Sequence, residues 1–262
     1  VPVLRPPLEL CKTTGVALEG GRVVVMFDRG GVGKALVSRL EKRGVQVLGI
    51  EAPPAEEAVA GLVEGWLAEG PIAGIYWLPA LDAEPEIEEL DLEQWRELNR
   101  VRVKNLYLLA HTLLAAQLEA NPFLVVGTRM GGLHGYSAEG ASSPLGGAVT
   151  GFAKAFKRER TAALVKAVDF EPGRKSVEPA EALIAETLLD PGVVEVGYHD
   201  NLRFGIGFEE RPAADGQPGM QLSPETVYLV TGAAGGITSA IVADLARAGG
   251  GGQFFLLDLT PA

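Results

Sequence analysis

The residues best suited to chemistry lie near the C-terminal end of the sequence, where Thr231-Gly-Ala-Ala-Gly-Gly236 follows an apolar run at 227–230. The run predicts a buried parallel strand, and 237–248 predicts a helix because its apolar residues recur at helical spacing. Glycines between a strand and a helix leave no Cβ in the way, so a diphosphate can approach backbone N–H groups at the helix N-terminus. The segment therefore predicts a phosphate-binding turn.

An acidic residue follows this turn at a useful spacing. The predicted strand 254–257 ends on Asp258, about 20 residues after the turn, where a carboxylate can accept a hydrogen bond from a ribose hydroxyl. A purely structural turn between a strand and a helix is the alternative. The strand, helix and acid are all present in the expected order, so the sequence favours dinucleotide binding.

The N-terminal part of the sequence contains a second copy of this arrangement, 205 residues earlier (236 minus 31). Its predicted strand, glycine turn, helix, strand and terminal acid are Arg22–Phe27, Asp28–Gly33, Lys34–Arg43, Val45–Ile50 and Glu51. An internal repeat of this length predicts two sheets of similar design rather than a solenoid.

The first copy differs from the second where a nucleotide would touch it. Phe27 stands in the place of Gly232, and its ring would block the close approach of a phosphate to the backbone. Gly31 and Gly33 remain, but glycines also serve the packing of a helix against a strand. We therefore expect no nucleotide at the first turn.

Helices and strands are predicted to alternate between the two copies, which is the pattern of an α/β protein with a parallel, doubly wound sheet. The helices are predicted at 55–67, 91–118, 147–158 and 179–189, and the strands at 72–78, 123–126, 163–170, 193–198 and 203–208. The last two strands form a predicted hairpin around Asp200-Asn201. Asp91 is the expected cap of the long second helix, whose expected buried residues are Trp95, Leu98, Val101, Leu106, Leu109 and Leu113.

The sequence divides into four predicted segments. Residues 1–21 form an entry segment with a strand at 16–18, 22–208 form the first sheet domain, 209–223 are a Pro/Gly-rich linker, and 224–262 form the first β-α-β unit of a second Rossmann fold. That short unit cannot bury both faces of a parallel strand pair alone, so we expect it to pack on further chain. The sequence begins at Val1 rather than Met, and we expect it to be part of a longer polypeptide.

Composition narrows the classes of partner. The net charge of −11 argues against nucleic acid and against anionic membrane, because phosphate contacts need clustered Lys and Arg. Local basic residues at Lys154, Lys157, Arg158 and Arg160 are expected to form a solvated helix face. Cys11 is the single cysteine, which excludes an internal disulfide and favours a reducing compartment. We expect a cytoplasmic protein without a membrane span or signal peptide.

No residue pair suited to hydride-transfer catalysis is present. In such chemistry a tyrosine donates the proton and a lysine four residues further lowers its pKa, with both on one helix face. The residues four positions after the five tyrosines are Ala80, His111, Gly140, Leu202 and Gly232. We predict no catalytic residue in this chain.

The histidines offer weaker alternatives. His111 lies in a Leu-rich helix and is expected to be packed or capping, and His199 is a turn residue beside Asp200. His134 follows a predicted strand in the loop 130–136, where active-site groups often lie, so a hydrolase built on the first sheet remains open. The motif Gly-x-Ser-x-Gly is absent. The acidic segment 82–89 has no His or Cys beside it and is expected to be solvated, so no metal site is predicted.

The duplicated arrangement, the linker and the Thr231–Thr238 turn together resemble the ketoreductase domain of type I polyketide synthases and polyunsaturated fatty acid synthases. That domain is similar to short-chain dehydrogenases, and in it a truncated Rossmann-like structural subdomain precedes the catalytic subdomain. The segment Phe123–Gly132 resembles the strand and loop that carry the family's serine, and Ser142–Ala148 resembles the start of its tyrosine/lysine helix. The hairpin Glu195–Asp200 with Arg203 is similar to the closing strand pair.

The resemblance also places the family's catalytic positions. Ser143 falls where the tyrosine would be, Gly147 where the lysine would be, and Arg102 where the helix asparagine would be. These departures are expected of a structural subdomain without catalysis.

The resemblance implies a nicotinamide cofactor in the C-terminal unit, held by Thr231, Gly232, Gly235, Gly236 and Ile237, with Asp258 beside the ribose. NADPH is the cofactor that the family implies. A carboxylate at Asp258 repels a 2′-phosphate, so NADH is the alternative. Thr238 replaces the family's last glycine, which narrows the packing of the helix.

The resemblance implies part of a reductase that converts 3-ketoacyl groups on an acyl carrier protein into 3-hydroxyacyl groups, with other synthase domains in the same polypeptide. This chain alone is expected to be inactive. The alternative is a non-catalytic pseudo-reductase that serves as a docking module in a multienzyme synthase.

Overall fold

The structure is a computed structural model that describes residues 1–116, 121–173, 175–212, 219 and 222–259. The chain divides into two units, Val1–Glu209 and Glu210–Ala262. Most of the predicted linker, at 213–218 and 220–221, lies outside the described residues, as do the end of the predicted helix 91–118 and the last three residues.

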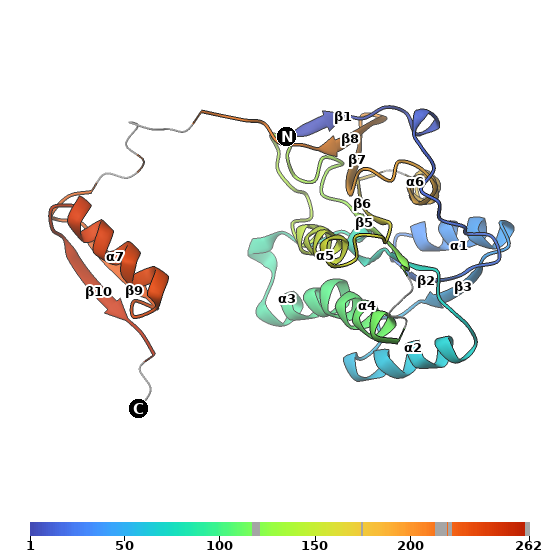
Figure 1. Cartoon of the computed structure of the whole chain (residues 1–262), viewed down its shortest axis with the longest axis horizontal. Coiled ribbons are helices and arrows are strands. Elements are labelled where there is room, and N and C mark those ends of the chain that lie inside the picture. Colours follow the sequence, from blue (N-terminus) through green and yellow to red (C-terminus); the bar gives the residue numbers. More distant parts are fainter. Residues whose placement is uncertain (117–120, 174, 213–218, 220–221, 260–262) are drawn as a thin grey trace. The chain divides into compact units, whose positions relative to one another are not determined.

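The apolar runs of the first unit form one eight-stranded sheet with the spatial order β1-β8-β7-β6-β5-β4-β2-β3 (Figure 1). The strands are β1 (Pro2–Leu4), β2 (Arg22–Met26), β3 (Gln46–Ile50), β4 (Gly74–Trp77), β5 (Phe123–Thr128), β6 (Val165–Phe170), β7 (Glu195–His199) and β8 (Leu202–Ile206). All pairs from β3 to β7 are parallel, and β8 pairs antiparallel with β7 and with β1. This arrangement confirms the α/β, Rossmann-like fold.

Helices cover both faces of the sheet, as parallel strands require. α1 (Val32–Lys42) and α6 (Val177–Leu188) pack on one face, and α2 (Val59–Ala68), α4 (Asn105–Ala116) and α5 (Gly146–Glu159) pack on the other (Figure 1). Alternate residues of β2 serve the two layers, with Val24 in the layer of α4 and Val25 in the layer of α1. Buried Leu, Ile and Val dominate both layers, which accounts for the near-continuous apolar runs in the sequence.

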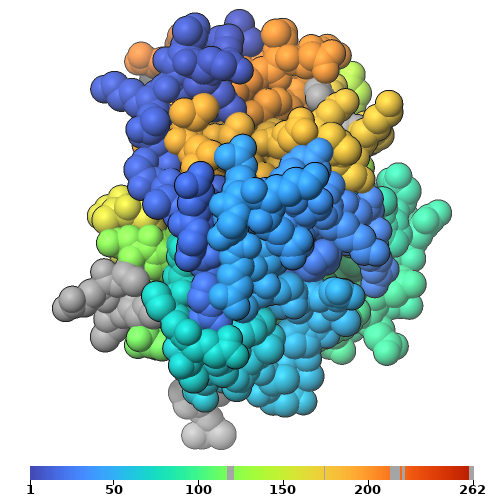
Figure 2. All heavy atoms as spheres, turned by 90° about the vertical axis from the view of Figure 1, so that its right-hand side faces the viewer, coloured from blue at the N-terminus to red at the C-terminus, as the bar shows by residue number. Residues whose placement is uncertain are grey.

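In the N-terminal segment the prediction of a strand at 16–18 is wrong, because no strand forms there. The strand is β1 instead, and Val3 lies opposite Gly205 at the edge of the sheet. The chain then runs along the surface beside α1 and α6, drawn in dark blue in Figure 2. Backbone hydrogen bonds from Thr14 N–H to the Leu188 carbonyl (2.9 Å) and from Asp190 N–H to the Lys12 carbonyl (2.8 Å) hold it there.

The predicted long helix is interrupted. α3 (Leu92–Asn99) begins with a capping box between Asp91 and Gln94, a π-helical turn occupies Arg100–Lys104, and α4 continues from Asn105. A π turn shifts backbone carbonyls out of the regular helical ladder. The indole N–H of Trp77 donates to one of them, the carbonyl of Arg102, at 2.8 Å.

The predicted buried face of this helix is right in its second half. In its first half the prediction is wrong for Trp95 and partly right for Leu98 and Val101, which are half-buried. Leu106, Leu109 and Leu113 are fully buried, whereas Trp95 is 38% exposed on α3. α3 has no buried residue of its own.

A buried ionic network, which the sequence did not reveal, joins the N-terminal segment to α6, β6 and β8. Glu186 accepts two hydrogen bonds from Arg203 (2.6 and 2.9 Å) and one from Lys166 (3.2 Å). Asp190 accepts from Arg203 (2.8 Å) and from Arg5 (2.9 Å). Because each buried charge is paired, the network fixes the position of the edge strands at a tolerable desolvation cost.

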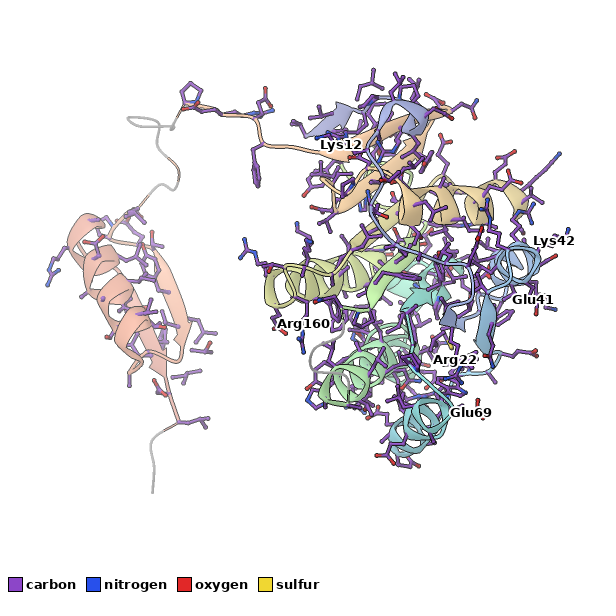
Figure 3. The ribbon with its side chains drawn as sticks, turned by 45° about the vertical axis from the view of Figure 1, so that its right-hand side comes forward. Lys12, Arg22, Glu41, Lys42, Glu69 and Arg160 are labelled. Carbon is purple, nitrogen blue, oxygen red and sulfur yellow. The ribbon has the colours of Figure 1, made fainter. Side chains whose placement is uncertain are left out.

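Arg22 at the start of β2 ties the sheet to the end of α2. Its guanidinium donates to the carbonyls of Trp66 (2.7 Å) and Gly70 (2.6 Å) and pairs with Glu69 at 2.8 Å, and Figure 3 shows Arg22 and Glu69 next to each other. A cation at this place satisfies the free carbonyls at a helix C-terminus.

The second unit contains β9 (Val227–Thr231), α7 (Gly236–Ala248) and β10 (Gln253–Leu257), and the two strands are parallel. Tyr228 and Phe254 stack at 4.4 Å between ring centroids. Leu229 is 71% exposed and Phe255 55% exposed. The unit therefore covers only part of its apolar surface.

In the described part of the chain, no helix is both long enough and apolar enough to cross a membrane.

Candidate functional site

The glycine turn of the second unit has the geometry that a phosphate site needs. Thr231 ends β9, Gly232 has φ +68°, and a Cβ added to Gly232 would meet no atom within 4 Å. Gly235 is the N-cap of α7, and its N–H donates to the Gly232 carbonyl at 3.1 Å. The space in front of the helix is therefore open, and only a residue without a Cβ adopts this backbone at no steric cost.

The first N–H groups of α7 meet no acceptor among the described side chains. Gly235 supplies no side-chain cap, and no other described side chain accepts a hydrogen bond from Gly236, Ile237 or Thr238. The Ile237 side chain is 81% exposed. A helix start of this kind carries a partial positive charge and unsatisfied donors, and both attract an anion.

The structure brings the predicted acid to this turn. Asp258 follows β10 directly, and its carboxylate accepts hydrogen bonds from the N–H of Ala234 within the turn and from its neighbour Leu259 (2.7 Å). The side chain is exposed, so its remaining lone pairs face solvent. All six predicted cofactor residues thus lie in the turn, at the helix start or at the end of the adjacent strand. That they bind a cofactor remains a prediction.

The first glycine turn, between β2 and α1, is closed. The Asp28 carboxylate accepts from the N–H groups of Val32 (3.1 Å) and Gly33 (2.7 Å), which are the first two residues of α1. A Cβ on Gly33 would lie 3.0 Å from the Phe27 ring, and one on Gly49 would also lie 3.0 Å from it. Phe27 therefore fills the space between α1 and β3, as expected from its size. The part of Asp28 was missed, although an acid just before a helix start is a recognisable capping signal.

A cavity of about 420 Å³ lies at the carboxyl ends of β2, β3 and β4. Its wall includes the π-helical turn, where Arg102 forms an ion pair with Glu84 and both side chains are only 2% exposed. Arg102 also donates to the backbone carbonyl of Asp82 at 2.8 Å. Glu84 belongs to the acidic segment that was predicted to be solvated, and for this residue the prediction is wrong because Arg102 draws it inward.

Asp82 lines the same cavity. Burial raises the pKa of its carboxyl above the ordinary value, against the opposing effect of the hydrogen bond from the Arg29 N–H (2.7 Å).

The three positions that the resemblance singles out, Ser143, Gly147 and Arg102, have different surroundings in the structure. Ser143 is buried, and its carbonyl accepts from Gly146 N–H (3.0 Å) just before α5. A Cβ added to Gly147 would meet no atom within 4 Å, and Arg102 forms an ion pair with Glu84.

His134 has no nucleophile among its hydrogen-bond partners. His134 as a residue is 9% exposed, its Nε2 lies 2.9 Å from the Val196 carbonyl, and its Nδ1 has no partner in the described part of the chain. Asp169 binds the His134 backbone N–H (2.8 Å) rather than the ring, and it also accepts from the Thr128 hydroxyl (2.7 Å). This cluster anchors the loop after β5, and nothing in it supports the hydrolase alternative. His111 is exposed beside Tyr107 rather than packed.

Glu171, His199 and Asp200 bring potential metal-binding atoms within 4.8 Å of one another. His199 Nδ1, however, lies 3.0 Å from the Gly131 carbonyl and 3.1 Å from the Glu171 carboxylate. Both oxygens lie within hydrogen-bond distance of this ring nitrogen, so hydrogen bonding accounts for the grouping. We assign no metal to this group.

No protein-family model and no curated protein matches the chain. Solved structures do match. The chain aligns over its whole length with 52% of an N-terminal ketoreductase from the macrolactin assembly line, at 13% identity and a TM-score of 0.66. It aligns over 99% of its length with 25% of a multidomain structure from a keto acid-selecting NRPS module that contains adenylation, ketoreductase and pseudo Asub domains (14% identity, TM-score 0.68).

The chain shares its fold with part of each of these two structures. A short-chain dehydrogenase/reductase from Serratia marcescens BCRC 10948 aligns with 68% of the chain and 94% of its own length (18% identity, TM-score 0.54). The likeness in fold to both groups is the one expected from the resemblance. The chain spans about half of the macrolactin ketoreductase and a quarter of the NRPS structure.

Proposed function

We propose that this chain is the structural subdomain and the first nucleotide-binding unit of a ketoreductase in a multienzyme synthase. The parent enzyme would use a nicotinamide cofactor to reduce a 3-ketoacyl group on an acyl carrier protein to the 3-hydroxyacyl group. The observation that carries the proposal is the open start of α7 beside Gly232, set in a fold shared with synthase ketoreductases. Cytoplasmic location, an acyl carrier protein and further synthase domains as partners belong to the same proposal.

The residues of the second turn fit the cofactor. The N–H groups of Gly236 and Ile237 would hold the diphosphate, and Asp258 would accept from a ribose hydroxyl. The bound nicotinamide supplies the hydride. This chain's residues would bind and orient the cofactor, and a group outside the described residues would donate the one proton that completes the reduction.

The negative charge of Asp258 bears on whether NADH or NADPH binds. The resemblance implies NADPH, whereas the Asp258 carboxylate beside the turn favours NADH because a 2′-phosphate would face a like charge. We propose that NADH binds at least as well as NADPH. Asp258→Arg should raise the ratio of NADPH affinity to NADH affinity by about tenfold, since about 1.4 kcal/mol of charge interaction corresponds to that factor.

Two assays test the function. The chain alone, given NADH or NADPH and a model ketone such as a decalone, should show no turnover, and appreciable turnover would contradict the proposed division of labour. The parent polypeptide should reduce a carrier-bound 3-ketoacyl group, and Gly232→Val should abolish that activity. If Gly232→Val left the activity intact, the turn would not be the cofactor site. If the parent showed no reduction at all, the chain would instead be a docking module.

A further inference from the structure

The cavity beside the first turn lies where the strand order of the first sheet reverses. β3 and β4 follow β2 in the chain and flank it on opposite sides in the sheet. Open α/β sheets bind ligands outside the carboxyl ends of their strands at such a switch point. The volume of about 420 Å³ is within the usual range for a small-molecule site. Position and size both mark this cavity as a ligand site.

The ribose end of a nucleotide site is retained here. Glu51 follows β3 directly, 20 residues after Gly31 (51 minus 31), and it lines the cavity. Its side chain is exposed and has no hydrogen bond or ion pair with any described residue. A carboxylate at this spacing is the group that accepts from ribose hydroxyls, and it corresponds to Asp258 in the second unit.

The phosphate end is occupied by the protein itself. The Asp28 carboxylate already binds the N–H groups of Val32 and Gly33, the donors that would otherwise hold a phosphate. A phosphate would meet this negative charge, and Phe27 blocks the backbone approach. The site therefore keeps the carboxylate that can accept from a ribose, whereas its phosphate-binding turn is closed.

The rest of the wall combines apolar surface with balanced charge, because the cations Arg29 and Lys34 accompany the carboxylates of Asp28 and Asp82. Pro53, Pro79, Leu98 and Val101 supply apolar surface, and the buried Arg102 is neutralised by Glu84. Glu97, which also lines the cavity, pairs with Arg100 at 2.7 Å. A heterocyclic base can lie against this apolar surface without leaving a buried charge unpaired.

We propose that the cavity at the carboxyl ends of β2, β3 and β4 binds a nucleoside that carries no phosphate, such as adenosine. The base lies against the apolar wall, and the ribose hydroxyls donate to Glu51. This site belongs to the first unit and is independent of the function proposed for the second turn.

A titration of the isotope-labelled chain followed by amide NMR tests this. Adenosine should shift the amide signals of Glu51, Leu98 and Val101 in a saturable way. AMP should bind at the same amides about tenfold more weakly, because its phosphate meets Asp28. If saturating adenosine leaves these signals unmoved, or if AMP binds there as tightly as adenosine, the proposal is wrong.

Substitutions of Glu51 and Val101 test whether these two residues form the adenosine site. Glu51→Gln, at an exposed position, should weaken adenosine about tenfold while the rest of the spectrum is unchanged, whereas Glu51→Asp should recover part of the affinity. Val101→Trp fills the cavity and should remove binding. Glu64→Gln, at an exposed position of α2 outside the cavity wall, is the matched control and should leave adenosine affinity unchanged. Unaltered affinity in both Glu51→Gln and Val101→Trp would overturn the assignment.

Discussion

The two glycine turns of this chain have the same order of strand, turn and helix, but among the described residues only the first has a carboxylate bound to the N–H groups at its helix start. Each follows a strand of a parallel pair and leads into a helix through a glycine N-cap, Gly31 for α1 and Gly235 for α7. At α1 the free N–H groups are satisfied by the Asp28 carboxylate, while at α7 no described side chain accepts from them. One internal carboxylate therefore decides whether a helix start is available to an external anion.

The two units also differ in how much of their apolar surface they bury. The central strands of the first unit, β4, β5 and β6, are buried along their whole length. In the second unit α7 has no buried residue, and Leu229 and Phe255 are largely exposed. Burial of apolar area is the main source of stability, so the first unit is expected to be the stable scaffold.

The largest expected effect concerns backbone protection. Amides of β5 and β6 should exchange at least about 1,000-fold more slowly than those of β9 and β10, a difference of about 4 kcal/mol in opening free energy, because the second unit buries so little. Hydrogen exchange measured residue by residue on the whole chain checks this. Equal protection in the two units would show that the second is stabilised by contacts that its own burial does not reveal.

Next in size is the effect of a side chain at the open turn. Gly232→Val should weaken NADH about 100-fold, since valine strains a backbone at φ +68° and its side chain enters the phosphate space. Calorimetric titration of NADH measures this. The control is Gly31→Ala in the first turn, at φ +90°, where an added Cβ would make only an ordinary contact with the Ser176 hydroxyl oxygen at 3.7 Å; it should leave NADH affinity unchanged. A similar loss in both variants would show that the two turns are not functionally distinct.

The charges held inside the first unit should give it a marked acid sensitivity. Burial raises the pKa of Asp190, but hydrogen bonds from Arg5 and Arg203 outweigh it and hold the pKa below the ordinary 3.8. A carboxyl with a lowered folded-state pKa contributes stability that is present above the unfolded value and is lost as the pH falls through the folded value.

Asp190→Asn should therefore cost about 2 kcal/mol of unfolding free energy at neutral pH, and the difference from the parent chain should shrink below about pH 4. Asparagine tolerates the φ of +56° at this position, so the backbone is not strained by the change. Urea unfolding at pH 7 and at pH 3 measures both values. A cost that does not change with pH would mean that the ion pairs are not its source.

The smallest expected effect is at the closed turn. Asp28→Ala should destabilise the first unit by about 1 kcal/mol, the usual loss when a helix N-terminus loses its side-chain cap, and Asp28→Asn should cost less because its amide oxygen still accepts. Asp258→Ala is the comparison in the second unit, where an exposed carboxylate meets one turn N–H. Urea unfolding of the three variants checks the order. A negligible effect of Asp28→Ala would show that solvent satisfies α1 equally well.

Local pattern was sufficient to predict most of the fold. The repeated strand-turn-helix units and the hairpin at Asp200-Asn201, both residues with positive φ, follow from short-range rules. The strand β1 escaped prediction because three residues carry no usable periodicity and form a strand only by pairing with β8. The π turn at Arg100–Lys104 escaped because it depends on Trp77 and Glu84, which approach from other elements.

The candidate site shows the same limit. Glycines and Asp258 were identified because their spacing is set by one strand and one helix. Blocking by Phe27 was expected from its size alone. The cavity at Glu51 depends on how β2, β3 and α1 meet, which the sequence does not state. The capping role of Asp28 is local and was overlooked, although an acid just before α1 signals it.

A structure of this chain crystallised with NADH tests the central comparison most directly. Density for the diphosphate should lie at the start of α7, against the N–H groups of Gly236 and Ile237, while Asp28 keeps its hydrogen bonds to Val32 and Gly33. Diphosphate density at the start of α1, with Asp28 displaced and the second turn empty, would contradict the account.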